Sequence, residues 1–187
     1  MIILRHVALS MDMDKLFKLY SDLETRFLFT NLLQIKSKDD FCEWFHFQVT
    51  NRFHEFRVIE DKGIFAGFCY SYDYQPDGVA KTAVCVSPEY RSSGIGAVGE
   101  LLFLDELFRM YPIRKIYNHV YAYNENSLRS NLDGGFEIEG QLKEYRFLDG
   151  AYHDLFILAI TREKFYCLHN DTLNTIRRNR ENDQQLS

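Results

Sequence analysis

The feature that most constrains the fold of this 187-residue chain is a strand, a glycine-containing loop and a helix in succession over residues 79–108. Residues 79–86 form a mostly apolar run that ends at Ser87-Pro88, where proline removes a backbone donor and restricts the preceding residue. Beyond the loop, apolar residues recur at helical spacing from Ile95 to Phe108. The sequence therefore predicts a strand that turns sharply into an amphipathic helix.

The loop between this strand and helix is short and contains two glycines. It consists of Arg91, Ser92, Ser93, Gly94, Ile95 and Gly96. Glycine lets the backbone curl tightly, so that several amide N–H groups point the same way, and the positive end of the helix dipole adds to them. Such a loop can hold a pyrophosphate by main-chain donors alone. Taken by itself, however, Gly-x-Gly before a helix is more often a tight turn than a phosphate site.

Two other nucleotide-binding loops fit this segment poorly. No Gly-Lys-Ser/Thr follows the glycines, as a P-loop requires. Gly94, Gly96 and Gly99 do match the Gly-x-Gly-x-x-Gly spacing of dinucleotide-binding folds. That loop usually opens a parallel unit, whereas here it lies in mid-chain after an expected antiparallel meander.

Hydrophobic periodicity and turn residues divide the rest of the chain into short elements. Expected strands cover residues 2–9, 53–59, 63–72, 115–123, 136–142 and 155–160. One expected helix follows Asp12 and Asp14 as far as Phe27, a second begins at a capping box at Ser37, and a third covers residues 124–133. The polar stretch 170–187 is expected to be a frayed helix or a disordered tail.

Composition narrows the function classes. The formal net charge is −5, and the largest basic cluster is confined to the last part of the chain, which argues against nucleic acid as the main partner. The four cysteines form no C-x-x-C pair, so that neither a zinc site nor a disulfide framework is expected. No signal peptide and no run of about 18 apolar residues is visible. We expect a soluble, cytoplasmic protein with no membrane partner and no metal.

Several short motifs add up to a family resemblance. The segment from Val84 to Gly96 contains Arg-x-x-Gly-x-Gly on a strand, loop and helix, and Asn124-x-x-Ser127, Gly135-Phe136, Glu139-Gly140 and residues 150–154 follow it. Together they resemble the GNAT superfamily of N-acetyltransferases. The match is to the branch of ribosomal-protein N-terminal (Rim-type) and spermidine acetyltransferases, and it covers about residues 79–160.

The resemblance implies a fold and a domain organisation. The expected fold class is α/β (α+β), with a mixed, mostly antiparallel twisted sheet of about six to seven strands flanked by about four helices. Two neighbouring strands, at residues 79–86 and 115–123, would splay apart and hold the cofactor between them. A single acetyltransferase domain would cover residues 1–169, followed by a polar tail over residues 170–187.

The resemblance also implies which residues contact acetyl-CoA. Amides of the loop would hold the pyrophosphate, Val86 would pair with pantetheine, and Asn124 would contact its amide. The implied cofactor-binding set is Val86, Arg91, Ser92, Ser93, Gly94, Ile95, Gly96, Asn124, Ser127 and Asn131.

The implied catalytic residues depart from the family pattern. Many GNAT enzymes place a tyrosine seven residues after the asparagine to protonate the departing thiolate, but this sequence has Asn131 there, so Ser127 is the expected substitute. Ser127 equally suits a plain role at the start of its helix. Rim-type enzymes carry a carboxylate where this chain has Arg146, which leaves Glu144 as the candidate base. Glu139, Glu55 and Asp73 are weaker candidates, since each suits a solvated surface position.

The implied function is acetyl transfer from acetyl-CoA to a primary amine. The acceptor would be a peptide N-terminus, a polyamine, an aminoglycoside or an amino sugar, and the sequence does not select among them. The alternative is a non-catalytic acetyl-CoA sensor or interaction module, which the missing tyrosine and the displaced carboxylate suggest. Dimers are frequent in this branch, so a homodimer is a further expectation, with Phe165 and Tyr166 as candidate interface residues.

Overall fold

A seven-stranded sheet runs through the molecule in the computed structural model, which describes residues 1–29, 37–51 and 54–185. The strands are β1 (Ile2–Arg5), β2 (Phe56–Asp61), β3 (Ile64–Gln75), β4 (Val79–Val86), β5 (Lys115–Tyr121), β6 (Glu137–Leu148) and β7 (Ala151–Thr161). Their order across the sheet is β1-β2-β3-β4-β5-β7-β6. All neighbours are antiparallel except β4 and β5, which are parallel.

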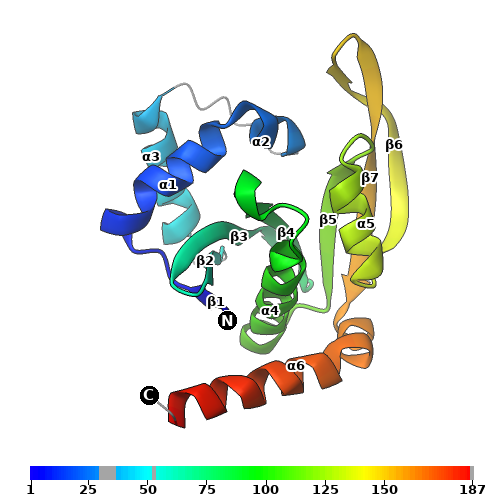
Figure 1. Ribbon diagram of the computed structural model, residues 1–187. Coiled ribbons are helices and arrows are strands. Elements are labelled where there is room, and N and C mark those ends of the chain that lie inside the picture. Colours follow the sequence, from blue (N-terminus) through cyan, green and yellow to red (C-terminus); the bar gives the residue numbers. More distant parts are fainter. Residues whose placement is uncertain (30–36, 52–53, 186–187) are drawn as a thin grey trace.

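Helices cover both faces of the sheet (Figure 1). They are α1 (Leu9–Ser21), α2 (Leu23–Leu28), α3 (Lys38–Thr50), α4 (Ile95–Met110), α5 (Glu125–Asp133) and α6 (Arg162–Gln185), with a 3-10 turn η1 at Pro88–Tyr90. The mixed, mostly antiparallel sheet confirms the expected fold class. The described residues contain six α-helices instead of about four, because α2 and α6 are separate helices.

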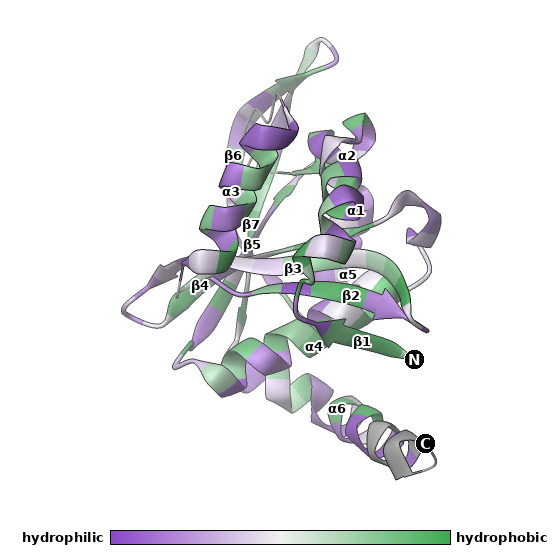
Figure 2. Ribbon diagram, turned by 90° about the vertical axis from the view of Figure 1, so that its left-hand side faces the viewer, coloured by the Kyte–Doolittle hydropathy of each residue, from purple (hydrophilic) through white to green (hydrophobic). Residues whose placement is uncertain are grey.

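Two hydrophobic cores lie on opposite sides of the sheet. Phe103 and Phe108 of α4 pack with Ile116 of β5 in one core, whereas Phe41 of α3 packs with Phe68 of β3 in the other. The helices carry both hydrophilic and hydrophobic residues along their length (Figure 2), as expected for helices that cover a sheet. No helix in the described ranges is long and apolar enough to cross a membrane.

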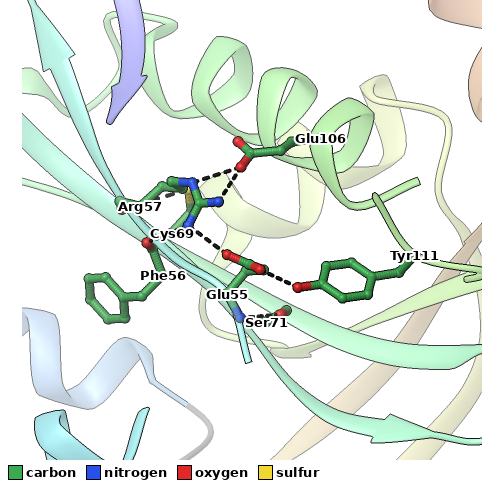
Figure 3. A network of polar contacts seen from close by, with 7 residues as sticks. All are labelled: Glu55, Phe56, Arg57, Cys69, Ser71, Glu106 and Tyr111. Carbon is green, nitrogen blue, oxygen red and sulfur yellow. Dashed lines mark hydrogen bonds and ion pairs between the residues drawn. The ribbon is translucent and has the colours of Figure 1, made fainter. Parts of the chain in front are cut away.

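A buried ion-pair network ties β2 to α4 on the first of these faces (Figure 3). The Arg57 guanidinium contacts a Glu55 carboxylate oxygen at 2.6 Å and donates from Nε to Glu106 Oε1 at 2.7 Å. The Tyr111 hydroxyl donates to Glu55. Because the Arg57 side chain is only 5% exposed, its charge depends on these two carboxylates for compensation.

Elements with clear local signals begin and end where the sequence predicted. The capping box is present, with the Ser37 hydroxyl accepting from the Asp40 amide at 3.0 Å and the Asp40 carboxylate accepting from the Ser37 amide at 3.2 Å. The strand at residues 79–86 matches β4, and α4 begins at Ile95. The predicted start of the strand at 53–59 lies partly outside the described residues, and the strand there begins at Phe56.

The N-terminal segment differs from expectation in two places. The first strand stops at Arg5, because its guanidinium binds the buried Asp12 carboxylate of the following helix at 2.7 Å and 2.9 Å. The expected helix up to Phe27 is broken at Asp22, whose carboxylate caps α2 by accepting from the Thr25 amide.

The C-terminal stretch forms an ordered helix that packs on the domain. Helix α6 continues to Gln185 across the expected boundary at residues 169 and 170. Leu173 is 1% exposed in the core with α4, and Arg177 binds both Asp105 carboxylate oxygens at 2.8 Å and 2.7 Å. Phe165 is also fully buried, so its side chain is not on a surface interface.

Candidate active site

Strands β4 and β5 part after a short stretch of pairing. Val79–Lys81 pair with Lys115–Tyr117, and the register ends there although β4 continues to Val86 and β5 to Tyr121. On its other side β4 stays paired with β3 as far as Val86. The second half of β4 therefore presents its β5-facing edge to an added strand, as the expected role of Val86 requires.

The loop before α4 is shaped to receive an anion. Ser92 and Gly94 have left-handed backbones, with φ of 59° and 84°, and such residues help successive amides converge. Gly94 is the N-cap of α4, and within the described residues this helix has no side-chain cap. The Ile95 amide makes a long contact of 3.4 Å to Ser93 Oγ, and the helix dipole and the other first-turn amides can serve a ligand. Ser92, Ser93 and Gly94 are exposed, so the loop fits a pyrophosphate-bearing ligand.

Close packing explains the second glycine of the loop. A Cβ added at Gly96 would lie 2.9 Å from Val86 Cγ2. Glycine therefore lets the first turn of α4 approach the end of β4 closely. Ile95 has its side chain buried in the core, so that only its backbone amide can serve the ligand.

The Arg91 side chain binds α2. It donates to Thr25 Oγ1 at 2.6 Å and to Glu24 Oε2 at 3.2 Å, both on α2. The guanidinium therefore links α2 to the loop, and the Arg91 amide donates to the Pro88 carbonyl at 3.2 Å.

Helix α5 and its N-cap bring together the expected site residues that follow β5. Asn124 is its N-cap, and its Oδ1 accepts from the Ser127 amide at 3.3 Å. One turn later, Asn131 is 5% exposed and its Nδ2 donates to the Ser127 carbonyl at 2.8 Å. Asn131 therefore fills the position of the family tyrosine as a buried hydrogen-bonded amide.

His119 is a candidate site residue that no sequence motif indicated. Successive strand residues point to opposite faces, and Ile116 and Val120 of β5 point into the core with α4. His119 consequently points to the other face, two residues beyond the last pairing of β5 with β4. Burial lowers the pKa of His119 below its ordinary value of 6.5, Lys81 lowers it further, and Asp73 opposes this.

The carboxylates considered as bases lie in dissimilar environments. Glu144 is exposed on an irregular stretch of β6 with φ of 51°, and its backbone amide donates to Asp154 Oδ1 at 2.8 Å. Glu139 and Asp73 pair with Lys115 and Lys81.

Arg146 spans from β6 to the end of α2. Its guanidinium lies 4.8 Å from the Tyr121 ring centroid and donates to the Phe27 carbonyl at 3.2 Å. A cation therefore stands where Rim-type enzymes carry a carboxylate.

Comparisons with known proteins agree with this geometry. The model of the acetyltransferase (GNAT) family matches residues 14–130. The SPbeta prophage-derived uncharacterized N-acetyltransferase YokL of Bacillus subtilis (strain 168) is 28% identical over 135 residues, 72% of this chain and 76% of that protein. The spermidine N(1)-acetyltransferase of Escherichia coli (strain K12) is 26% identical over 97 residues, 52% of each chain.

A solved structure shares the fold. The spermidine N-acetyltransferase from Vibrio cholerae, crystallised in complex with CoA and spermine, superposes with a TM-score of 0.80 at 22% identity. The superposition covers 88% of this chain and 97% of that chain. At this identity the likeness shows the fold alone.

Proposed function

Because the chain belongs to the acetyltransferase (GNAT) family and is an acetyl-CoA-dependent N-acetyltransferase, we propose that its acceptor is a primary amine of a polyamine. Support comes from the E. coli relative, named a spermidine N(1)-acetyltransferase, and from the V. cholerae structure with CoA and spermine. The formal net charge of −5 favours a cationic acceptor over an anionic one.

The loop and the β4 edge hold the acetyl donor in this proposal. The proposed donors to its pyrophosphate are amides of Arg91, Ser92, Ser93, Gly94, Ile95 and Gly96. Those of Arg91, Ser93 and Ile95 also have acceptors within η1 and the loop, at 3.2 to 3.4 Å. The Val86 backbone pairs with pantetheine, and the Asn124 side-chain amide contacts it from α5. Bound there, acetyl-CoA supplies an acetyl group activated as a thioester.

His119 takes the proton that the attacking amine must lose. An imidazole with a lowered pKa is neutral near pH 7 and can accept this proton. It lies on the strand face opposite α4, close to where β4 and β5 part. Glu144 stays a prediction for the same role, but its exposure favours a solvated carboxylate.

Ser127, on α5, assists the departure of the thiol. Its hydroxyl donates a hydrogen bond to sulfur while the carbon–sulfur bond breaks and the electron pair leaves with sulfur. The proton that His119 has taken then returns through solvent, so that the products are the N-acetylated amine and CoASH.

The parting of β4 and β5 next to an uncapped helix N-terminus is the observation that carries this proposal. The test is thiol release from acetyl-CoA with spermidine, spermine, an N-terminal peptide, an aminoglycoside and an amino-sugar nucleotide. We expect saturable release with the polyamines, with kcat/KM at least about tenfold above every other class. Preference for another class would contradict the polyamine assignment and keep the acetyltransferase.

The alternative of a non-catalytic acetyl-CoA sensor rests on Asn131 at the tyrosine position and Arg146 at the carboxylate position, and the relatives named N-acetyltransferases favour the enzyme. The sensor alternative predicts binding of acetyl-CoA without thiol release for any amine.

The proposal also includes the organisation of the protein. We propose one acetyltransferase domain that includes α6 beyond the expected boundary at residue 169, a cytoplasmic location, no nucleic-acid or membrane partner, and a homodimer. The exposed side chains of Phe147 and Tyr152, on the β6–β7 hairpin, are the apolar groups that a dimer would cover.

A further inference from the structure

A chain of side-chain amides begins where β4 and β5 part. Thr82 and Asn118 are the first residues of the two strands beyond the paired stretch. Both are buried, at 3% and 6% exposed, and the Thr82 hydroxyl donates to Asn118 Oδ1 at 2.6 Å. A side-chain hydrogen bond therefore joins the two strands at the point where their backbone hydrogen bonds end.

Asn118 connects this point to two helices. Its Nδ2 donates to Glu100 Oε1 of α4 at 2.7 Å and to Asn131 Oδ1 of α5 at 2.6 Å. Asn131 in turn donates from Nδ2 to the Ser127 carbonyl at 2.8 Å, and the same nitrogen lies 3.5 Å from Ser127 Oγ. The chain thus runs from the parting strands to the proposed proton-donating serine.

The donor and the acceptor of each hydrogen bond in this series of side chains follow from the last bond, which Asn131 makes to the Ser127 carbonyl. A backbone carbonyl only accepts, so Asn131 must turn its NH₂ group toward Ser127 and its oxygen toward Asn118. Asn118 must then turn its own NH₂ group toward Asn131 and its oxygen toward Thr82. This orientation holds whether the Glu100 carboxyl is ionised or protonated.

The consequence concerns the Ser127 proton. A serine hydroxyl inside a helix often donates back to a carbonyl four residues earlier, which would withdraw the proton from the site. Here an N–H of Asn131 faces Ser127 Oγ, so that the oxygen is the acceptor in this contact and the hydroxyl proton points away from Asn131. The 3.5 Å contact is long and sets an orientation without a strong bond.

We propose that Asn131, held by Asn118, is a positioning residue that keeps the Ser127 hydroxyl directed as a donor toward the thiol sulfur. This inference rests on the proposed role of Ser127 in the reaction. Asn131, at the position of the family tyrosine, acts in this inference through Ser127 and does not touch the thiol.

The test is a double-mutant cycle on the single-turnover rate of acetyl transfer, with Ser127→Ala, Asn131→Ala and the double variant. We expect Ser127→Ala to lower the rate about 10²-fold and Asn131→Ala about tenfold. The double variant should be no slower than Ser127→Ala, because Asn131 acts only through the hydroxyl. Calorimetry on all three variants measures acetyl-CoA affinity separately, so that the loss of rate is compared at saturating acetyl-CoA.

Asn126→Ala is the matched control, since it makes the same change at an exposed position of the same helix and should leave the rate unchanged. If Asn131→Ala fails to fold, Asn131→Asp takes its place in the cycle. That variant keeps the volume and the acceptor for Asn118, but its carboxylate attracts the Ser127 proton, so we expect a loss at least as large as that of Ser127→Ala.

Each contrary outcome is distinguishable. Losses that multiply to about 10³-fold in the double variant, or a wild-type rate for Asn131→Ala or Asn131→Asp, would overturn this inference alone. A wild-type rate for Ser127→Ala would overturn it by removing its premise. A wild-type protein that acetylates no amine would instead contradict the proposed function together with the inference.

Discussion

At the scale of the single residue, His119 is the side chain that we propose as the acceptor of the proton lost by the amine. The imidazole must be neutral to accept a proton, and burial together with Lys81 keeps its pKa below 6.5. Asp73, which pairs with Lys81 at 2.7 Å, limits this shift. The acid side of the pH profile should therefore report His119.

The expected profile of kcat/KM has two parts on the acid side. Between about pH 7 and 9 its logarithm should rise with a slope of about one, because only the acceptor amine, with a pKa of roughly 10, loses a proton there. Below the His119 pKa the slope should approach two. His119→Gln should lower kcat/KM about 10²-fold and keep a slope of one throughout; a slope of two in that variant would show that another group is the base.

Glu100 is a second residue whose environment changes its titration. Burial raises its pKa from an ordinary 4.5 to about 7, and the hydrogen bond from Asn118 only partly offsets this. The folded state thus binds this proton more tightly than the unfolded chain does. Stability from this group is complete below about pH 4.5 and is lost as the pH rises to 7.

Replacing Glu100 by glutamine should therefore stabilise the protein more at high pH. We expect Glu100→Gln to raise the free energy of unfolding by about 2 kcal/mol more at pH 8 than at pH 5, measured by urea titration. Glu43→Gln, at an exposed position of α3, should show no such difference. Equal effects of Glu100→Gln at both pH values would mean that Glu100 titrates normally in the folded protein.

The sequence identified the loop residues better than the catalytic ones. Gly94 and Gly96 stand in a local pattern whose spacing alone predicts the turn before α4. The role of His119 depends on where β4 and β5 stop pairing, which is a long-range property of the sheet. The alternation of Ile116, Asn118 and Val120 toward one face was the available signal that His119 points to the other.

At the scale of the element, helix α6 shows how a polar composition can conceal a packed helix. Only a few of its side chains reach the core, and Leu173 does so one turn before the ion pair of Arg177 with Asp105. The stretch therefore resembled a tail, because its anchoring contacts are made with α4, far away in the sequence.

Leu173→Ala should destabilise the protein by about 3 kcal/mol, because it leaves a cavity in the core with α4. Leu168→Ala is the control on the same helix, since that leucine is 52% exposed, and it should cost less than about 1 kcal/mol. Thermal or urea unfolding measures both. Equal effects of the two variants would indicate that α6 is not packed against the domain in solution.

At the scale of the whole molecule, the sheet positions both the backbone groups proposed for the acetyl donor and the side chains proposed for proton transfer. In the proposed function, the second half of β4 and the start of α4 provide the backbone groups for the acetyl donor, and β5 and α5 provide the side chains His119 and Ser127. The family resemblance predicted the loop, Val86 and Ser127 but not His119, and the β6–β7 hairpin turns at Asp149-Gly150, whose two residues have positive φ.

The most direct test of the account is calorimetric titration of acetyl-CoA into the wild-type protein, Gly96→Val and Gly140→Val. Valine at position 96 would meet Val86 and crowd the loop, whereas the nearest atom to a Cβ at position 140 is at an ordinary 3.5 Å. We predict one site per chain in the wild type, affinity weakened at least about tenfold by Gly96→Val, and affinity within about twofold of wild type for Gly140→Val. Absence of binding to the wild type, or equal binding by all three proteins, would contradict the claim that this loop holds the acetyl donor.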